Sequence, residues 1–172
     1  HPDVASIMHN LAGLLQIKKS FSEAESLFRK ALKIDQKNHP PDHPSVARSL
    51  NNFAGFLRET SQHAEAETLY RTALAIDIKK FGVGHPNVAT SLNNLGLLLE
   101  DMSNIVEAEK MMCQALEIDE KFFGPAHPNV ARYLSNLAGL FFSINRNVEA
   151  EKLILRALKI DEEFFGKNHP LV

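Results

Sequence analysis

The chain has 172 residues, of which 44% are hydrophobic and 23% charged, so it has enough apolar material to bury a core. Its formal net charge is −2, which argues against a nucleic-acid partner, because phosphate binding needs a concentrated excess of Lys and Arg. No apolar run approaches the roughly 18 residues of a membrane span, so we expect no membrane partner.

One 42-residue sequence is written four times along the chain. The copies are residues 1–42, 43–84, 85–126 and 127–168, and residues 169–172 start a fifth. Twelve columns are identical in all four copies, and they read H-P-x-V-A, then Asn, then E-A-E, then A-L-x-I-D. A fixed period of this size is typical of a stacked-repeat solenoid, so we expect one array over 1–172.

Each copy predicts two helices joined by a tight turn. In copy three, Pro86 suits the first position of a helix, with His85 or the residue before it as the cap. Apolar residues then follow at helical spacing, residues 101–104 indicate a short polar turn, and a second helix starts near Ile105. Gly124 marks the end of that second helix.

Small residues recur in both helices and predict close helix packing. The first helix carries Ala12, Ala54, Gly96 and Ala138, and the second carries Ala24, Ala66, Ala108 and Ala150. Helix axes approach to about 8 Å only where side chains are small. One helix pair cannot bury both of its faces, so stability is expected to come from stacking between neighbouring copies.

The first copy departs from the pattern near its end. Where the other copies read F-G, it reads Asn38-His39-Pro40-Pro41. We therefore expect its second helix to end earlier, followed by a stiffer link to copy two.

The wording H-P-x-V-A-x-x-L-N-N-L and E-A-E-x-L-Y-x-x-A-L-x-I-D-x-K-x-F-G resembles the tetratricopeptide repeat (TPR). The usual repeat has about 34 residues. These longer copies are similar to the 42-residue branch found in kinesin light chain, in bacterial multi-repeat TPR proteins and in nephrocystin-like proteins. The resemblance implies an all-α fold, an α-α superhelix of four helix-turn-helix repeats, that acts as a non-enzymatic scaffold for a protein or peptide partner.

The resemblance also implies that the first helices line a concave groove in which a peptide binds. Helical spacing leaves one stripe of each first helix free of the core. The predicted peptide-binding residues on this stripe are Asn10, Arg48, Asn51, Asn52, Asn93, Asn94, Leu97, Arg132 and Asn136.

Asparagine recurs in the middle of this stripe although it is a poor helix former. It stands at Asn10, Asn52, Asn94 and Asn136. A row of side-chain amides can hold the backbone of an extended peptide. Alternatively, each Asn bonds to the next repeat and sets the stacking angle.

Arg48 and Arg132 stand at equivalent places on the same stripe. Arginine suits bidentate contact with a carboxylate, although either residue could equally be solvated or paired with a nearby Glu. Ser6 and Thr90 stand where further basic residues would complete a clamp for a C-terminal carboxylate, so we do not expect recognition of chaperone tails.

No pattern in the sequence predicts a catalytic residue, a cofactor or a metal site. The histidines that recur every 42 residues each precede a Pro at a helix start. Successive histidines are therefore expected about 10 Å apart, which is too far for two of them to share one metal ion. The single Cys113 cannot form an internal disulfide, which favours a reducing compartment, and we expect a cytoplasmic protein.

Two other functions remain open. The chain lacks an initiator Met and both of its ends fall at repeat boundaries, so we expect it to be a piece of a longer array. Faces that normally stack on a neighbour would then allow end-to-end self-association. The array could also be a regulatory sensor module of a larger signalling protein.

Overall fold

The computed structural model describes residues 2–166, which form eight helices and no strand. The all-α helix-pair fold predicted from the sequence is therefore confirmed. The predicted cap at His1 and the start of a fifth copy at 169–172 lie outside the described residues.

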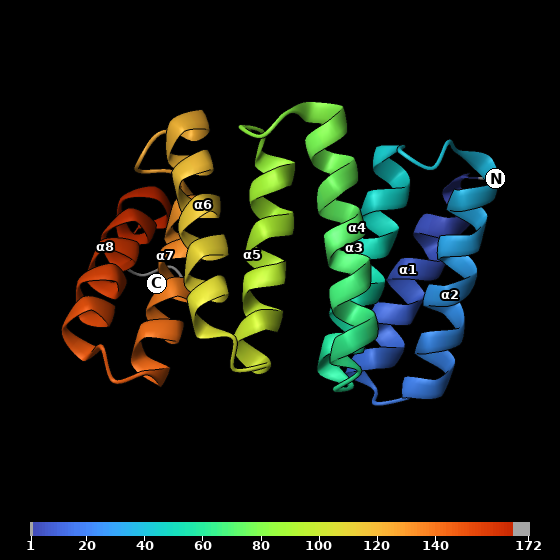
Figure 1. The fold of residues 1–172 in the computed structure, drawn as a ribbon, viewed down its shortest axis with the longest axis horizontal. Coiled ribbons are helices and arrows are strands. Elements are labelled where there is room, and N and C mark those ends of the chain that lie inside the picture. The colour runs from blue at the N-terminus through green and yellow to red at the C-terminus, as the bar shows by residue number, and fades with distance from the viewer. Residues whose placement is uncertain (1, 167–172) are drawn as a thin grey trace. The chain divides into compact units, whose positions relative to one another are not determined.

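Each copy contributes one helix pair, whose two helices lie side by side (Figure 1). The helices are α1 (Pro2–Ile17), α2 (Phe21–Asn38), α3 (Pro44–Glu59), α4 (His63–Phe81), α5 (Pro86–Asp101), α6 (Ile105–Phe123), α7 (Pro128–Ser143) and α8 (Asn147–Phe165). They divide into two compact units, unit 1 (His1–Gly82) and unit 2 (Val83–Val172), each of which is described by itself. A single array over 1–172 stays a prediction.

The recurring His-Pro pair starts the first helix of a copy. Pro occupies the first turn, and the His before it is the N-cap. The Nδ1 atoms of His43, His85 and His127 accept hydrogen bonds of 3.1–3.2 Å from the backbone N–H two residues further on. The same rings contact neighbouring aromatic rings, as in the stack of His127 on Phe123 at 4.3 Å. The cap and the ring contact explain why histidine recurs here.

A left-handed residue turns the chain between the two helices of every copy. Lys19, Ser61, Ser103 and Asn145 all have φ of 61°. In copy three, the next residue, Asn104, donates its backbone N–H to the carbonyl of Leu99 at 2.8 Å. This is the bond of a Schellman motif, which satisfies a free carbonyl at the helix end and reverses the chain.

The second helix of copy one ends earlier than its counterparts, as predicted. α2 has 18 residues, whereas α4, α6 and α8 have 19. His39 is extended at φ −134° and leads into Pro40 and Pro41, whereas Gly82 and Gly124 follow the longer helices at φ 81° and 90°. The stiffness of the link in copy one stays a prediction.

The two helices of copy three approach most closely at Gly96. A Cβ atom on this residue would lie 2.8 Å from Cγ of Met112 and 3.3 Å from the carbonyl oxygen of Ala108. The other copies have Ala here, fully buried, opposite a side chain other than Met. The predicted packing of small residues is confirmed at this position.

The first helix of copy two also packs against the preceding copy. Phe28 of α2 lies 6.2 Å from Phe53 and 5.3 Å from Phe56 between ring centroids, and both partners belong to α3. Leu32 of α2 packs on a buried cluster of α3 and α4 that includes Leu50. α3 therefore buries apolar side chains on two sides.

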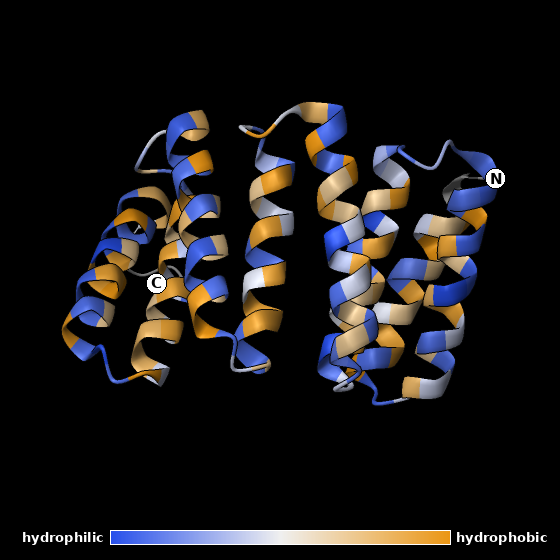
Figure 2. Ribbon diagram, in the orientation of Figure 1, coloured by the Kyte–Doolittle hydropathy of each residue, from blue (hydrophilic) through white to orange (hydrophobic). Residues whose placement is uncertain are grey.

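Unit 2 repeats this arrangement. Val130, Ala131 and Leu134 of α7 form a buried cluster with α8, and Leu116 of α6 packs against it. In Figure 2, each helix carries both hydrophobic and hydrophilic residues.

None of the helices among residues 2–166 combines the length and the hydrophobicity needed to cross a membrane.

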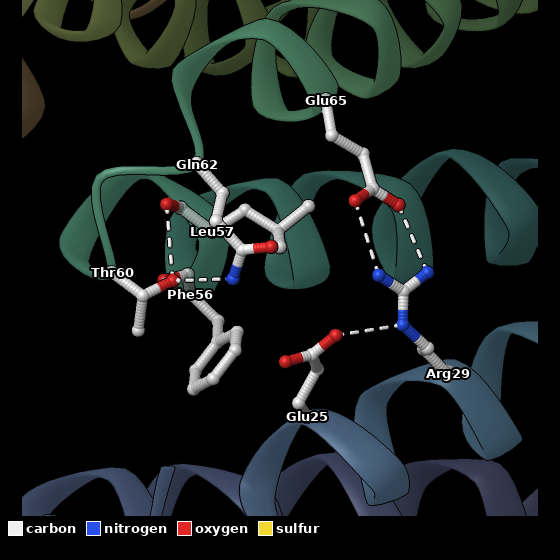
Figure 3. Close-up of polar contacts among 7 residues, drawn as sticks. All are labelled: Glu25, Arg29, Phe56, Leu57, Thr60, Gln62 and Glu65. Atoms are coloured by element: carbon white, nitrogen blue, oxygen red, sulfur yellow. Dashed lines mark hydrogen bonds and ion pairs between the residues drawn. The ribbon is translucent and has the colours of Figure 1, made fainter. Parts of the chain in front are cut away.

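Ion pairs on the second helices join neighbouring copies at the surface. Arg29 of α2 donates to both carboxylate oxygens of Glu65 in α4, at 2.9 and 3.1 Å, and to Glu25 in its own helix (Figure 3). The guanidinium also lies 4.8 Å from the centroid of the Phe53 ring. Exposed pairs of this kind contribute only about 0–1 kcal/mol each, so apolar packing carries the junction.

Replacing two helical glycines by Ala should have opposite effects on stability. Gly139→Ala should raise the free energy of unfolding by up to about 1 kcal/mol, because Ala favours a helix and a Cβ there meets nothing within 4 Å. Gly96→Ala should give no such gain and should lower stability, because Met112 has to move. Urea denaturation measures both, and equal gains would contradict the close approach at Gly96.

Candidate functional site

The predicted peptide-binding residues lie on α1 and α3 in unit 1 and on α5 and α7 in unit 2. Their accessibility to solvent differs. Asn10, Arg48, Asn52 and Arg132 are exposed; Asn51, Asn94, Leu97 and Asn136 are half-buried; and Asn93 is only 2% exposed. Each unit therefore has solvent-accessible amide and guanidinium groups on its first helices, whereas Asn93 has almost no exposed surface.

In unit 2, two of the predicted residues contact each other. Nδ2 of Asn136 in α7 donates a 3.0 Å hydrogen bond to Oδ1 of Asn93 in α5. This bond joins copy four to copy three, so Asn136 makes a contact between copies, although with the preceding copy and not with the next one. It also fixes the orientation of the Asn136 amide, which lies partly at the surface.

Arg132 is held in place by a neighbour that sequence reasoning missed. Its guanidinium lies 4.7 Å from the centroid of the Tyr133 ring, and Nη2 lies 3.2 Å from the Tyr133 hydroxyl. That hydroxyl also lies 3.3 Å from Oγ1 of Thr90 in α5. The sequence did carry a signal for this residue, because the seventh position of the copies changes to a large aromatic residue in copy four alone. It is occupied by Ile7, Ser49, Ser91 and Tyr133.

Burial shapes the electrostatics beneath Arg132. The Asp119 carboxylate is fully buried and accepts no hydrogen bond of normal geometry. Burial raises its pKa, and the nearby Asn129 amide and Arg132 charge only partly oppose this rise. Burial likewise raises the pKa of the Tyr133 hydroxyl, which therefore stays protonated and acts as a hydrogen-bonding group.

Unit 1 has a different polar cluster at the equivalent junction. Oγ of Ser49 in α3 donates a short hydrogen bond to the Asp35 carboxylate of α2, and Nε2 of His9 in α1 lies 2.6 Å from the same Oγ. All three side chains are buried. Burial lowers the pKa of His9, with a further lowering by Arg48 of α3 and an opposing effect of Asp35.

Metal ligands and the single cysteine are two other candidate features of the described residues. Among the residues that it describes, no group of three or more His, Cys, Asp or Glu could hold a metal ion. Cys113 is half-buried, and burial together with Glu109 and Glu117 raises the pKa of its thiol. A raised pKa lowers the thiolate fraction and hence the reactivity of a cysteine.

We expect His9 to make the stability of unit 1 depend on pH. The pKa of His9 is lower in the folded chain than the value of about 6.5 for an unfolded histidine. Above about pH 6.5 the histidine is neutral in both states, and the folded chain has its full stability. As the pH falls below this value, the unfolded chain binds the proton more readily, so stability is lost. His9→Asn introduces the residue that copies two and three have at this place, Asn51 and Asn93. Urea denaturation at pH 7.5 and pH 5.5 should show a smaller loss of stability for this variant than for wild type. An equal loss would contradict a neutral buried His9.

The buried carboxylates of Asp35 and Asp119 should respond oppositely to Asn substitution. Asp35→Asn weakens the bond from Ser49 and should cost about 1–3 kcal/mol. Asp119→Asn removes a buried charge that accepts no hydrogen bond of normal geometry, and it should raise stability at pH 7. The gain should shrink as the pH falls toward the raised pKa of Asp119, because wild type then becomes neutral too. Thermal unfolding of both variants measures this, and a destabilised Asp119→Asn would contradict the assignment.

Solved structures of similar fold were found for nearly the whole chain. The crystal structure of BtubC (BKLC) from P. vanneervenii is 26% identical with a TM-score of 0.81, and the match covers 99% of this chain and 68% of that one. The crystal structure of a putative kinesin light chain from Podosopora anserina, with nearly identical TPR-like repeats, is 25% identical with a TM-score of 0.82, covering 99% and 81%. The apo form of RapI is 18% identical with a TM-score of 0.76, covering 95% and 57%, and shows the fold alone.

These neighbours confirm the predicted fold class, an α-α superhelix of TPR-like helix pairs, and the predicted similarity to kinesin light chain-like repeats. A search of the curated proteins finds no match. The family model described as tetratricopeptide repeat matches residues 3–78, 46–121 and 88–163 in three overlapping stretches. The chain therefore belongs to the tetratricopeptide repeat family.

Proposed function

We propose that this chain is a non-catalytic scaffold that binds a peptide segment of a partner protein along its first helices. Repeats of this family generally mediate protein–protein interaction. The observation that carries the proposal is the placement of amide and guanidinium groups on one face of the first helices in both units. These groups remain accessible although the helices around them are deeply packed.

In unit 2, the ligand contacts are Asn94, Arg132 and Asn136, with Leu97 as an apolar contact. Arg132 and Asn136 are already oriented, by Tyr133 and by Asn93 respectively. Groups that are fixed before binding lose less conformational entropy when the ligand arrives. Asn93 contributes indirectly, because it is buried and holds the Asn136 amide in position.

In unit 1, the equivalent contacts are Asn10, Arg48 and Asn52, with Asn51 partly accessible. The chemistry of these groups favours a particular ligand. Side-chain amides pair with the N–H and C=O groups of an extended backbone, and a guanidinium pairs with a carboxylate. The partner segment is therefore an extended peptide that carries an acidic side chain.

A displayed library of random 12-residue peptides tests this function. Peptides selected on wild type would be synthesised with a fluorescent label, and their affinity measured by fluorescence polarisation. Two variants separate the units: Arg48→Glu with Asn52→Ala in unit 1, and Asn94→Ala with Arg132→Glu in unit 2. Each should weaken those peptides that bind its own unit by roughly tenfold or more, because a charge-assisted contact becomes repulsive.

The matched control is Lys110→Glu, a charge reversal at an exposed position of the second helix α6. It should leave peptide affinity unchanged. Circular dichroism should show equal helix content in all variants. Selected peptides that bind both first-helix variants as tightly as wild type, but lose affinity for Lys110→Glu, would contradict the proposal.

A further inference from the structure

The seventh position of the repeat changes its contacts between unit 1 and unit 2. It is occupied by Ser49 in copy two and by Tyr133 in copy four. In unit 1, Oγ of Ser49 donates to the Asp35 carboxylate in the second helix of the preceding copy. The equivalent carboxylate in unit 2 is that of Asp119, which is fully buried, and none of the described residues gives it a hydrogen bond of normal geometry. The tyrosine therefore does not bind the buried carboxylate as the serine does.

The hydroxyl of Tyr133 contacts residues of the first helices instead. Nη2 of Arg132 donates to it at 3.2 Å, and Oγ1 of Thr90 in α5 lies 3.3 Å from it. The guanidinium of Arg132 also lies over the Tyr133 ring, 4.7 Å from its centroid. Tyr133 is only 1% exposed, whereas Arg132 is exposed. A buried aromatic residue thus supports an arginine at the surface.

Arg48 of unit 1 has a neighbour of a different kind. Ser49 has no ring on which a guanidinium could lie. Its hydroxyl is bonded to Asp35 and lies 2.6 Å from Nε2 of His9, so its hydrogen-bonding capacity is used inside the junction. Arg48 and Arg132 stand at the same position of their copies, but the neighbour at the seventh position holds only Arg132.

A fixed guanidinium is a better partner for a carboxylate than a mobile one. An arginine that is held before binding has less side-chain entropy to lose when the ligand arrives. A guanidinium and a carboxylate form charge-assisted hydrogen bonds, whereas a side-chain amide of the same shape carries no charge and binds more weakly. The advantage should therefore appear as a preference for Asp or Glu over Asn or Gln in the ligand.

The buried carboxylate of Asp119 is left without the donor that its counterpart has in unit 1. A buried acceptor that loses its hydrogen bond destabilises the fold. Sequences depart from the locally favourable residue mainly where function requires another one. Tyr133 therefore does more than fill the space between α5 and α7.

On the basis of the proposed peptide-binding function, we propose that Tyr133 is a positioning residue that makes unit 2 more selective than unit 1 for an acidic side chain of the ligand. Tyr133 acts through Arg132, because it is itself buried and has no exposed surface for the peptide. The hydroxyl and the ring hold the guanidinium in the orientation in which it meets the carboxylate.

Side-chain NMR of the free chain tests whether Tyr133 holds the arginine. Relaxation of the arginine Nε–H groups should show a more rigid side chain for Arg132 than for Arg48 on the picosecond-to-nanosecond timescale. Tyr133→Phe keeps the buried ring and removes the hydroxyl, so it should make Arg132 more mobile. The matched control is Tyr70→Phe, which removes the hydroxyl of a buried tyrosine in unit 1 and should leave Arg132 unchanged.

Peptide affinity tests the effect on selectivity. A selected peptide that loses affinity for Arg132→Gln is made in two forms, one with its acidic residue and one with the corresponding amide. Tyr133→Phe should raise the dissociation constant of the acidic form by roughly threefold to tenfold and leave that of the amide form nearly unchanged. A purely structural role would weaken both forms equally. Peptides that depend on Arg48 should prefer the acidic form less strongly.

Three results would overturn the proposal. Arg132 could be as mobile as Arg48 in the wild-type chain. Tyr133→Phe could change the affinities of the acidic and amide forms by the same factor while the chain remains folded. Peptides that depend on Arg48 could prefer the acidic form as strongly as those that depend on Arg132.

The relaxation measurement separates these results from a failure of peptide binding itself. A rigid Arg132 that Tyr133→Phe loosens, together with selected peptides that never depend on Arg132, would show that the arginine is held as described. It would also show that unit 2 does not bind the peptide there, which would contradict both the binding function and the selectivity.

Discussion

The groove between the two helices of a copy constrains the rest of the molecule. Small residues bring the helices together, as at Gly96, and a groove remains that one helix pair cannot cover. In unit 1, this groove takes Phe53 and Phe56 from the first helix of the next copy. Because the large apolar side chains of α3 are used in this way, only one narrow stripe of α3 stays free for other contacts.

That stripe is where the proposed binding function is located. Its polar residues are of two kinds, which the structure separates. Residues such as Asn52 and Arg132 project to solvent, whereas Asn93 and His9 are buried at the junction with the next copy. The buried residues specify how copies pack and orient the exposed ones, as Asn93 does for Asn136. The proposed recognition and the stacking of copies therefore use the same helices.

Much of the fold follows from the sequence because its signals are local and repeated. The His-Pro starts, the polar turns and the glycine stops set the helix ends, and the prolines after His39 correctly indicated the shorter α2. The period also showed which positions recur. It did not show which side chains each position contacts, because neighbouring copies contact each other through residues 14, 40 or 43 positions apart. The burial of Asn93 and the roles of Tyr133, Asp35 and Asp119 were missed for this reason.

The most direct test of the proposed binding function is a crystal structure of the chain with its tightest selected peptide bound. The account predicts an extended peptide along the first helices of a unit, with its backbone at Asn52 or at Asn94 and Asn136, and an acidic group at Arg48 or Arg132. A peptide that lies across the second helices, or that leaves these asparagines and arginines without contact, would contradict it.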